Sequence, residues 1–368
     1  MQRLLCIVGR MNRGGAETFL MKLYRQLDRT RYQMDFCVAS REPGDYDEEI
    51  WQLGGRILYT TPKSRNPFAS FYSIYNIVKE NKYHSVLRIS QHSLSCLELL
   101  AARLAKADKV IFRSSNTQSC GSWLNRLLHR VFTPLAYLIP TVRIAPSPEA
   151  AQFMFGTTKG VHVLNNGLDT KLFKFSSENC QKIRQEFNLQ DKFIVGHIGR
   201  FNFQKNHKFL LQIFAEIKKQ QPNSVLWLIG KGELEQEIKQ QISKLGLTDS
   251  VQFLGIRADI PALLSAMDVF IFPSFFEGMP NTVIEAQTCG LPCLVSDTIT
   301  QQARVTNLVH FMNLKQPATQ WAEKALEIAA EQTLDKRPQA AQQMRAAGYD
   351  IAEVVQQFTK LVFGEDVK

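Results

Sequence analysis

Two acidic residues eight positions apart, Glu277 and Glu285, flank the expected start of a helix. A strand is predicted to end at Pro273, Pro280 takes the first helical position, and Gly290 ends the helix. Glu277 would then lie just before the helix N-terminus, and Glu285 about one turn inside it. A carboxylate there can accept hydrogen bonds from hydroxyl groups, and a helix N-terminus attracts phosphate. A binding site for a ligand carrying both groups is predicted, with a helix cap and a solvated helix face as the structural alternative.

Backbone N–H groups at the start of this helix are expected to face the same space. They belong to Asn281, Thr282 and Val283. Such groups have no partner within the helix, so they are available to a ligand.

Two cations, Arg200 and Lys205, follow the predicted strand Phe193–Ile198. Arginine can bind an anion with two parallel hydrogen bonds, and lysine acts as a point charge. Fixed cations at a strand end could stabilise an anionic leaving group without reorganising. With two cations and a helix N-terminus available, neither a metal nor a cofactor is predicted. A solvated surface loop is the alternative.

Gly14 and Gly15 come a few residues after the apolar run Leu4–Val8. Glycine lets the backbone approach a phosphate closely. The pair fits a plain turn equally well.

Apolar runs of strand length alternate with helical patterns along the whole chain, which predicts an α/β fold of parallel sheets covered on both faces. Two Rossmann-like, doubly wound domains facing a cleft are expected, over residues 1–168 and 169–348. The polar stretch Leu164–Asn188 is interpreted as the linker. A last helix, Ile351–Phe363, forms a separate segment (349–368) expected to cross back to the first domain. In such folds ligands bind at the carboxyl ends of the strands.

The net charge of +10 is unevenly distributed. Residues 1–170 hold 22 Lys and Arg against 13 Asp and Glu, and residues 171–368 hold 22 against 21. The basic first part suggests an anionic partner, either a phosphorylated substrate, an anionic membrane surface or nucleic acid, or else serves solubility alone. The apolar run Leu4–Val8 is too short for a signal peptide, so a cytoplasmic protein is expected. The seven cysteines lack paired spacing and are interpreted as small buried residues.

Several segments resemble one known family. The stretch 269–297 is similar to the Glu-x7-Glu signature of retaining GT-B glycosyltransferases, in particular the large family numbered 4. Further similar segments are HIGRFNFQKNH at 197–207, LIGKGELE at 228–235, VQFLGIRADI at 251–260, NNGLD at 165–169 and Gly14-Gly15-Ala16-Glu17. The resemblance covers the whole chain, and it is closest to enzymes of bacterial capsule and exopolysaccharide assembly.

The resemblance implies transfer of a hexose or N-acetylhexosamine from a UDP-sugar to a lipid-linked glycan or an oligosaccharide acceptor, with retention and without a metal. Glu277, Arg200 and Lys205 would be the catalytic residues, with Glu277 contacting the sugar hydroxyls and the two cations contacting the diphosphate. Glu285 would bind the donor through its ribose. The remaining donor-binding residues would be Gly14, Gly15, Gly278, Met279, Asn281, Thr282 and, near the base, Arg257.

One position departs from the family pattern. Family members often carry a histidine after a late strand of the first domain, whereas the corresponding segment here, 110–118, holds Arg113. Arginine cannot act as a base, although it could contact the donor or the acceptor. His92, which follows the predicted strand Ser85–Ile89, is a second candidate for acceptor contact, with a structural role as its alternative.

The segment 122–140 combines Trp123 and several leucines with Arg126 and Arg130. It resembles an amphipathic helix at a membrane surface. A long helix buried in the first domain is the favoured interpretation. The membrane alternative would place the protein peripherally on the cytoplasmic face and would account for the basic first part.

Two other functions remain open at the level of sequence. A sugar-nucleotide epimerase or hydrolase would share the architecture and would form product without an acceptor. A non-catalytic partner subunit or a nucleic-acid-binding protein is the other possibility. Because basic and aromatic residues are not interleaved as in RNA-binding modules, nucleic acid is not expected as a partner.

Overall fold

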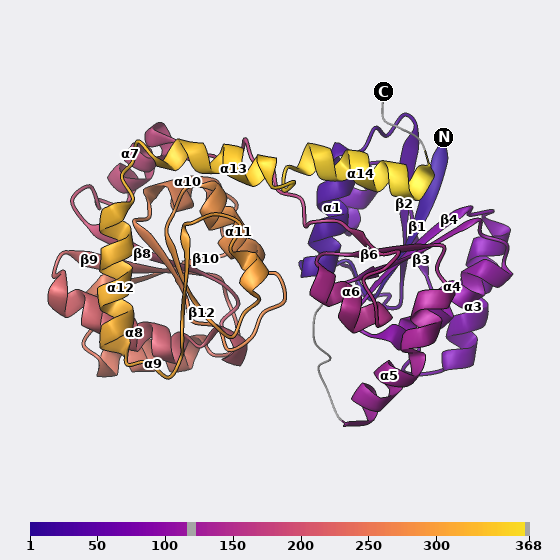
Figure 1. Cartoon of the computed structure of the whole chain (residues 1–368), viewed down its shortest axis with the longest axis horizontal. Helices are drawn as coiled ribbons and strands as arrows, with labels where there is room; N and C mark the ends of the chain where they lie inside the picture. Colours follow the sequence, from indigo (N-terminus) through magenta and orange to yellow (C-terminus); the bar gives the residue numbers. More distant parts are fainter. Residues whose placement is uncertain (116–122, 365–368) are drawn as a thin grey trace. The chain divides into compact units, whose positions relative to one another are not determined.

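The computed structural model describes residues 1–115 and 123–364. The described chain forms two compact units. One contains Met1–Gly167 together with the chain from Tyr349 onward, and the other contains Leu168–Gly348. Each unit has its own sheet and its own apolar core (Figure 1).

The N-terminal unit is built on a seven-stranded parallel sheet in the order β3-β2-β1-β4-β5-β6-β7. Its strands are β1 (Gln2–Val8), β2 (Tyr32–Val38), β3 (Ile57–Tyr59), β4 (Ser85–Ser90), β5 (Lys109–Ser114), β6 (Val142–Ala145) and β7 (His162–Val163). Its helices are α1 (Gly15–Gln26), α2 (Asp47–Gln52), α3 (Pro67–Glu80), α4 (Cys96–Leu104), α5 (Trp123–Leu138), α6 (Pro148–Phe155) and α14 (Ile351–Phe363).

The C-terminal unit is built on a six-stranded parallel sheet in the order β10-β9-β8-β11-β12-β13. Its strands are β8 (Phe193–Ile198), β9 (Ser224–Ile229), β10 (Val251–Gly255), β11 (Val269–Phe272), β12 (Cys293–Ser296) and β13 (Val309–Met312). Its helices are α7 (Ser177–Glu186), α8 (His207–Gln220), α9 (Glu235–Lys244), α10 (Ile260–Ala266), α11 (Asn281–Thr288), α12 (Ala318–Glu331) and α13 (Ala340–Ala346).

Both sheets reverse their strand order at one point, between β1 and β4 in the first and between β8 and β11 in the second. This is the doubly wound arrangement of the Rossmann fold, in which ligands bind at the carboxyl ends of the strands beside the reversal. Successive side chains of one strand point to opposite faces of the sheet, so they pack into different apolar clusters. Leu4 and Cys6 of β1 belong to one apolar cluster, and Leu5 and Ile7 belong to another. The predicted pair of Rossmann-like α/β units is confirmed.

The last helix was expected to cross back to the first domain, and it does. Val354, Phe358 and Val362 of α14 are fully buried in the core of the N-terminal unit. The ring of Phe363 stacks on Tyr32 of β2 at a centroid distance of 4.4 Å. In Figure 1, α14 lies alongside α1.

The linker prediction over Leu164–Asn188 is wrong for its second half, because residues 177–186 form α7. The Ser176 side chain accepts a hydrogen bond from the Asn179 N–H at 3.1 Å and caps this helix. Cys180 and Ile183 are buried in the C-terminal core. Polar residues outnumber apolar ones in this helix, so its sequence lacks a strong apolar period.

The favoured interpretation of segment 122–140 is also wrong. Of the residues in α5, only His129 and Ala136 are buried. Trp123 is 69% exposed and Val131 is 59% exposed. Ser122 lies outside the described residues, as do positions 116–118 of the segment around Arg113.

Several elements were not predicted, among them β6, β7, α6, β13, α12 and α13. The strands in this group are short, and they become strands by pairing with a neighbour in the sheet. Cysteines behave as expected wherever the structure describes them. Cys6, Cys37, Cys96, Cys180, Cys289 and Cys293 are all buried and free, and Cys120 lies outside the described part. None of the helices in the described residues has the length and apolarity needed to span a membrane.

Candidate active site

Lys205 is placed by a short loop at the carboxyl end of β8. The chain leaves β8 at Gly199, forms one 3-10 turn over Phe203–Lys205, and enters α8 through Asn206. Asn206 has a φ of 53°, a left-handed conformation that asparagine tolerates better than most residues. Its side-chain amide donates to the Pro273 carbonyl at 3.1 Å, which joins the loop after β8 to the loop after β11.

Lys205 and Glu277 form an ion pair at this edge of the sheet. The Lys205 ammonium lies 2.6 Å from a Glu277 carboxylate oxygen, and the two side chains are only 15% and 11% exposed. The same ammonium lies 4.4 Å from the centroid of the Phe272 ring, at the end of β11. The pair sits where the strand order reverses, so the structure brings together two of the three predicted catalytic residues.

The third predicted catalytic residue, Arg200, is more exposed. Its guanidinium pairs with Glu233 at 3.1 Å, with side-chain exposures of 71% and 56%. An exposed pair of this kind contributes little to stability, so Arg200 can exchange Glu233 for a ligand anion at low cost.

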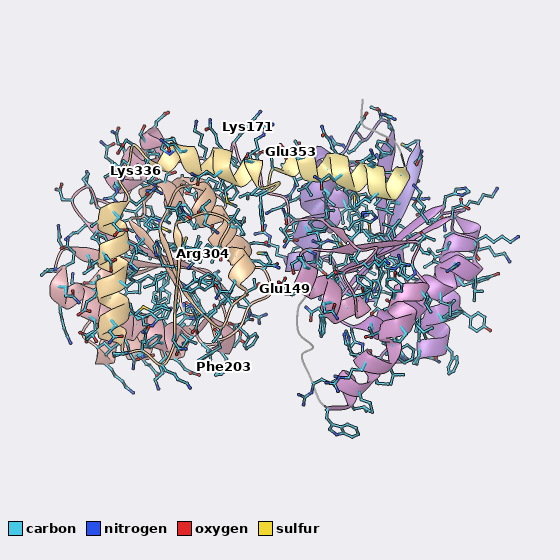
Figure 2. The ribbon with its side chains drawn as sticks, viewed as in Figure 1. Glu149, Lys171, Phe203, Arg304, Lys336 and Glu353 are labelled. Atoms are coloured by element: carbon cyan, nitrogen blue, oxygen red, sulfur yellow. The ribbon has the colours of Figure 1, made fainter. Side chains whose placement is uncertain are left out.

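A second set of contacts holds the loop that carries Glu277. The Gln204 amide donates to the Phe276 carbonyl at 2.8 Å, and the Phe275 N–H donates to the Gln204 carbonyl at 2.9 Å. Phe203, labelled in Figure 2, stacks on Phe275 at 4.7 Å. The loop is therefore joined directly to the segment that carries Lys205.

The other side of the same loop is anchored to the end of β12. The hydroxyl groups of Ser296 and Thr298 both donate to the Ser274 carbonyl, at 2.5 and 2.9 Å. Sequence reasoning missed these anchoring residues because their partners are distant in the chain. The one available signal we see is a serine at the end of each of two neighbouring strands, Ser274 and Ser296.

The helix that follows Glu277 starts one residue later than predicted. Pro280 is the N-cap, with extended backbone, and Asn281 begins α11. The Val283 N–H donates to the Pro280 carbonyl at 3.1 Å. The expectation that this group faces a ligand is therefore wrong for Val283.

Most predicted donor-binding residues follow β11. Gly278 and Met279 lie in the loop between Glu277 and α11, and Asn281, Thr282 and Glu285 are half-buried on α11. Residues four apart lie on one face of a helix, so Asn281 and Glu285 share a face. Arg257 is at the same edge of the sheet but follows β10, two strands away from β8, and it forms two hydrogen bonds with Asp259 at 2.8 and 2.6 Å.

Two histidines lie beneath the ion pair. His197 and His207 are buried with rings 4.8 Å apart. Burial, reinforced by the nearby Lys205 charge, lowers the pKa of His207 to about 4. Burial also lowers the pKa of His197. Both rings are therefore neutral near pH 7 and add no charge beneath Lys205.

In the N-terminal unit, the predicted glycines begin α1 after β1. Gly14 is the N-cap, in ordinary extended backbone, and Gly15 is the first helical residue. A side chain at Gly15 would meet no atom of the described chain within 4 Å. Neither conformation nor packing in this unit requires glycine there, which fits the close approach of a ligand.

Arg113, at the position where the resemblance led us to expect histidine, is buried at the end of β5. Its guanidinium lies 3.8 Å from the centroid of the Phe19 ring and donates to the Asn166 side-chain oxygen at 2.6 Å. Burial lowers its pKa to about 9. The Arg113 guanidinium is therefore held by the Phe19 ring and the Asn166 amide oxygen, and not by a carboxylate of the described chain.

His92 follows β4 and contacts backbone through both ring nitrogens. Nδ1 accepts from the Leu94 N–H at 3.2 Å, and Nε2 lies 2.7 Å from the Asn125 carbonyl. These contacts join β4 to α5, so a structural role for His92 accounts for its position.

One sequence feature bears on metal binding. Asp45-Tyr46-Asp47 is an Asp-x-Asp triplet of the kind that metal-dependent transferases use. Asp45 accepts from the Arg13 N–H at 3.0 Å, and Asp47 accepts from the Gly44 N–H at 2.8 Å. Both carboxylates therefore order the turn before α2.

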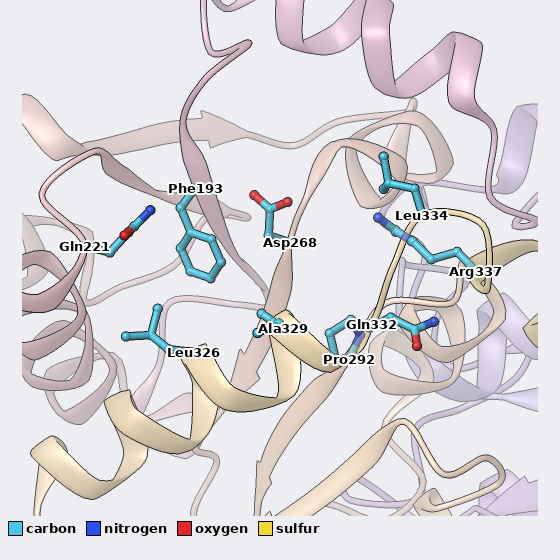
Figure 3. Close-up of a pocket in the computed structure, with 10 residues that line it drawn as sticks. Phe193, Gln221, Asp268, Pro292, Leu326, Ala329, Gln332, Leu334 and Arg337 are labelled. Atoms are coloured by element: carbon cyan, nitrogen blue, oxygen red, sulfur yellow. The ribbon is translucent and has the colours of Figure 1, made fainter.

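A hollow of about 350 Å³ lies at the opposite, amino edge of the C-terminal sheet. Figure 3 shows Phe193, Asp268 and Pro292, at the starts of β8, β11 and β12, together with side chains of α12. Asp268 also forms an ion pair with Arg184 at 2.8 Å. Since ligands of doubly wound sheets bind at the other edge, this hollow is not assigned to the donor.

Comparison with known proteins relates both halves of the chain to one class of enzyme. A family model described as Glycosyltransferase Family 4 matches residues 13–172, and one described as Glycosyl transferases group 1 matches residues 179–348. A Bacillus subtilis protein named as a glycosyltransferase, EpsF, is 35% identical over 363 residues, covering 96% of this chain and 94% of that protein.

Other similar proteins are more distant. The Escherichia coli UDP-Gal:alpha-D-GlcNAc-diphosphoundecaprenol alpha-1,3-galactosyltransferase is 29% identical over 242 residues, covering 62% of this chain and 61% of that enzyme. The crystal structure of Anabaena HepE in complex with UDP matches with a TM-score of 0.80 at 21% identity, covering 99% and 100% of the two chains. The likeness to HepE supports the fold.

Since the EpsF match spans nearly all of both proteins and each half matches a glycosyltransferase model, the chain belongs to the glycosyltransferases of family 4 and group 1.

Proposed function

We propose that this glycosyltransferase moves a hexose or N-acetylhexosamine from a UDP-sugar to a lipid-linked glycan acceptor in cell-surface polysaccharide assembly. The observation that carries the proposal is the Lys205–Glu277 pair at the strand reversal of the C-terminal sheet. The E. coli relative's name includes a UDP-linked donor and a diphosphoundecaprenol acceptor. HepE structures hold UDP or UDP-glucose.

In the proposed mechanism, Lys205 and Arg200 stabilise the negative charge that develops on the departing nucleoside diphosphate. Lys205 is held in a site with little exposure, where a fixed charge acts more strongly than in water. Glu277 orients the donor through its sugar hydroxyls and keeps Lys205 in place. Glu285, one turn into α11, contacts the ribose.

Two finer points are part of the proposal. Transfer proceeds with retention of the anomeric configuration, and the two cations supply the charge stabilisation for which other transferases use a divalent metal. Proton NMR of the product from an α-linked nucleotide-sugar checks the first point, because retention gives an α linkage. Full turnover in EDTA is the expected result for the second.

We propose that α5 binds the cytoplasmic face of the membrane and that the enzyme reaches its lipid-linked acceptor there. This helix exposes Trp123, Leu127 and Val131 and carries Arg126 and Arg130. Apolar side chains beside basic ones are typical of helices that lie in the interface of an anionic bilayer.

A vesicle co-sedimentation experiment tests the role of α5. We expect binding to vesicles containing phosphatidylglycerol, and an at least fivefold weaker binding for the double variant Leu127→Ser and Val131→Ser. The matched control is Leu104→Ser, a 58% exposed leucine at the end of α4. Equal binding by both variants would contradict the assignment to α5.

The donor is tested with the purified protein and a panel of nucleotide-sugars in the presence of EDTA. We expect one UDP-sugar to raise the melting temperature and to be hydrolysed slowly, with much faster turnover when a lipid-linked acceptor is added. Fast product formation without any acceptor would instead favour an epimerase or hydrolase.

A further inference from the structure

A second hollow, of about 530 Å³, lies in the N-terminal unit between α3 and α4. Its walls are mainly apolar and include Phe68, Phe71 and Tyr72 of α3 with Leu94 and Leu97. Its lining also includes two charged residues, Lys63 and Glu98, and we call this charged part its rim. We refer to this hollow as the α3–α4 pocket.

The pocket lies at the ligand-binding edge of the N-terminal sheet. Lys63 and the start of α3 follow β3, and Leu94 lies in the 3-10 turn that follows β4. Both segments follow the carboxyl ends of parallel strands, and this is the edge at which open α/β sheets bind ligands. The hollow in the C-terminal unit lies instead at the amino edge of its sheet.

The aromatic walls are unusually exposed. Phe68 is 80% exposed and Tyr72 is 65% exposed, and they lie four residues apart on one face of α3. Large apolar side chains gathered around a hollow commonly mark a binding site for an apolar group. The walls therefore favour a hydrocarbon over a free sugar.

The charged groups at the rim favour an anion next to that hydrocarbon. The Lys63 ammonium lies 2.9 Å from the Ser95 hydroxyl and 3.6 Å from the Glu98 carboxylate, which Arg88 also pairs. Two cations thus share one carboxylate, which leaves a surplus positive charge. The Lys63 side chain is 47% exposed and can reach a bound group.

The pocket also adjoins α5. Ser93, next to Leu94, donates its hydroxyl to the His129 carbonyl at 2.6 Å and its N–H to the His129 ring at 3.2 Å. The turn that forms one wall of the pocket is therefore fixed to the helix that exposes apolar side chains. A lipid that reaches α5 would be close to the pocket.

We propose that the α3–α4 pocket holds the first isoprene units of a prenyl diphosphate acceptor, with Lys63 beside the diphosphate. The inference rests on the proposed function, because it assigns a site to the lipid-linked acceptor. An apolar wall and a surplus cation at one rim match a ligand with a hydrocarbon chain and an anionic head.

Binding to the full-length protein is measured by calorimetry with farnesyl diphosphate, farnesol, inorganic diphosphate and dihexanoyl phosphatidylglycerol. We expect farnesyl diphosphate to bind most tightly, and the double variant Phe68→Ala and Tyr72→Ala to weaken it at least fivefold. Lys63→Met should weaken farnesyl diphosphate but not farnesol. The matched control is Trp51→Ala, a 57% exposed aromatic residue on α2.

A transfer assay separates failure of the pocket from failure of the proposed function. The assay compares two acceptors that share the same sugar diphosphate. One carries a 15-carbon prenyl chain and the other carries a propyl chain. We expect the ratio of the KM for the propyl acceptor to that for the prenyl acceptor to fall at least fivefold in the double aromatic variant.

The outcomes are distinguishable. If the wild type transfers sugar to both acceptors but the variant keeps the same KM ratio, the pocket assignment is wrong while the proposed function stands. If the wild type transfers to neither acceptor, the proposed function itself fails. Binding of phosphatidylglycerol as tight as that of farnesyl diphosphate would also overturn the assignment to a prenyl diphosphate.

Discussion

The ion pair of Lys205 and Glu277 concentrates opposite charges where little water reaches them. Withdrawing two such charges from water costs free energy, so a pair of this kind is weak evidence for stability. Its place at the strand reversal favours a functional role. Each group satisfies the other, and a bound donor can replace part of that interaction.

Replacing Lys205 with methionine tests this role. Lys205→Met removes the charge but keeps an unbranched side chain, and we expect kcat to fall by a factor of roughly 100 to 1,000. The matched control is Lys239→Met, which removes a lysine that likewise contacts an aromatic ring and pairs with a glutamate, but on the surface of α9. Activity of Lys205→Met within fivefold of the wild type would contradict the catalytic assignment, provided that the melting temperature is unchanged.

Arg337 illustrates how one buried side chain holds several elements together. Its guanidinium donates to the carbonyls of Leu264, Ser265 and Met267 at the end of α10. It also donates to the Cys289 carbonyl at the end of α11. Because α11 carries Glu285, this cation fixes the far end of a helix that contributes to the candidate site.

We expect Arg337→Met to destabilise the C-terminal unit by about 3 kcal/mol, because several buried carbonyls lose their donor. Urea unfolding monitored by circular dichroism measures the change. Lys324→Met on the surface of α12 serves as the control, with an expected change under about 0.5 kcal/mol. An equally small change for Arg337→Met would show that water or neighbouring groups replace the lost hydrogen bonds.

At the scale of the whole molecule, acid acts on different buried groups in the two units. His197 and His207 lie in the C-terminal unit, buried and neutral. The unfolded chain binds a proton at His207 near pH 6.5, whereas the folded unit does so only near pH 4. The stabilising effect of the neutral ring is therefore complete above pH 6.5 and is lost progressively as the pH falls toward 4.

In the N-terminal unit, Arg3, Arg56 and Tyr83 surround Asp35 with hydrogen bonds that outweigh its burial and lower its pKa to about 2. The Asp35 carboxylate stabilises the folded unit at any pH above its ordinary pKa near 4. This contribution is lost only as the pH falls toward 2. Acidification from pH 7 to 5 should therefore leave this contribution intact.

Differential scanning calorimetry at pH 7.5 and pH 5 measures the effect of acid on the C-terminal unit. We expect the C-terminal unit to lose about 2 kcal/mol through His207 alone at pH 5. His207→Phe should remove that part of the pH dependence, whereas His162→Gln, at an exposed position of the N-terminal unit, should not. An unchanged pH dependence in His207→Phe would show that this histidine is not the cause.

Much of this architecture could be predicted from local patterns. Strand-length apolar runs alternating with helices predicted two parallel sheets, because a buried strand and an amphipathic helix each leave a periodic trace in the chain. Elements without that trace were missed or misassigned. In α7 polar residues dominate, and β7 has two residues that become a strand only by pairing with β6.

The candidate site divides in the same way. Residue types and spacing were enough to select Glu277, Glu285, Arg200 and Lys205, because carboxylates and cations after strands follow a simple rule of parallel sheets. Only the tertiary structure decided which of them meet. It paired Lys205 with Glu277, left Arg200 on an exposed surface, and held Arg113 by stacking on Phe19. Contacts between residues tens of positions apart depend on strand order and side-chain packing, and neither leaves a local pattern in the sequence.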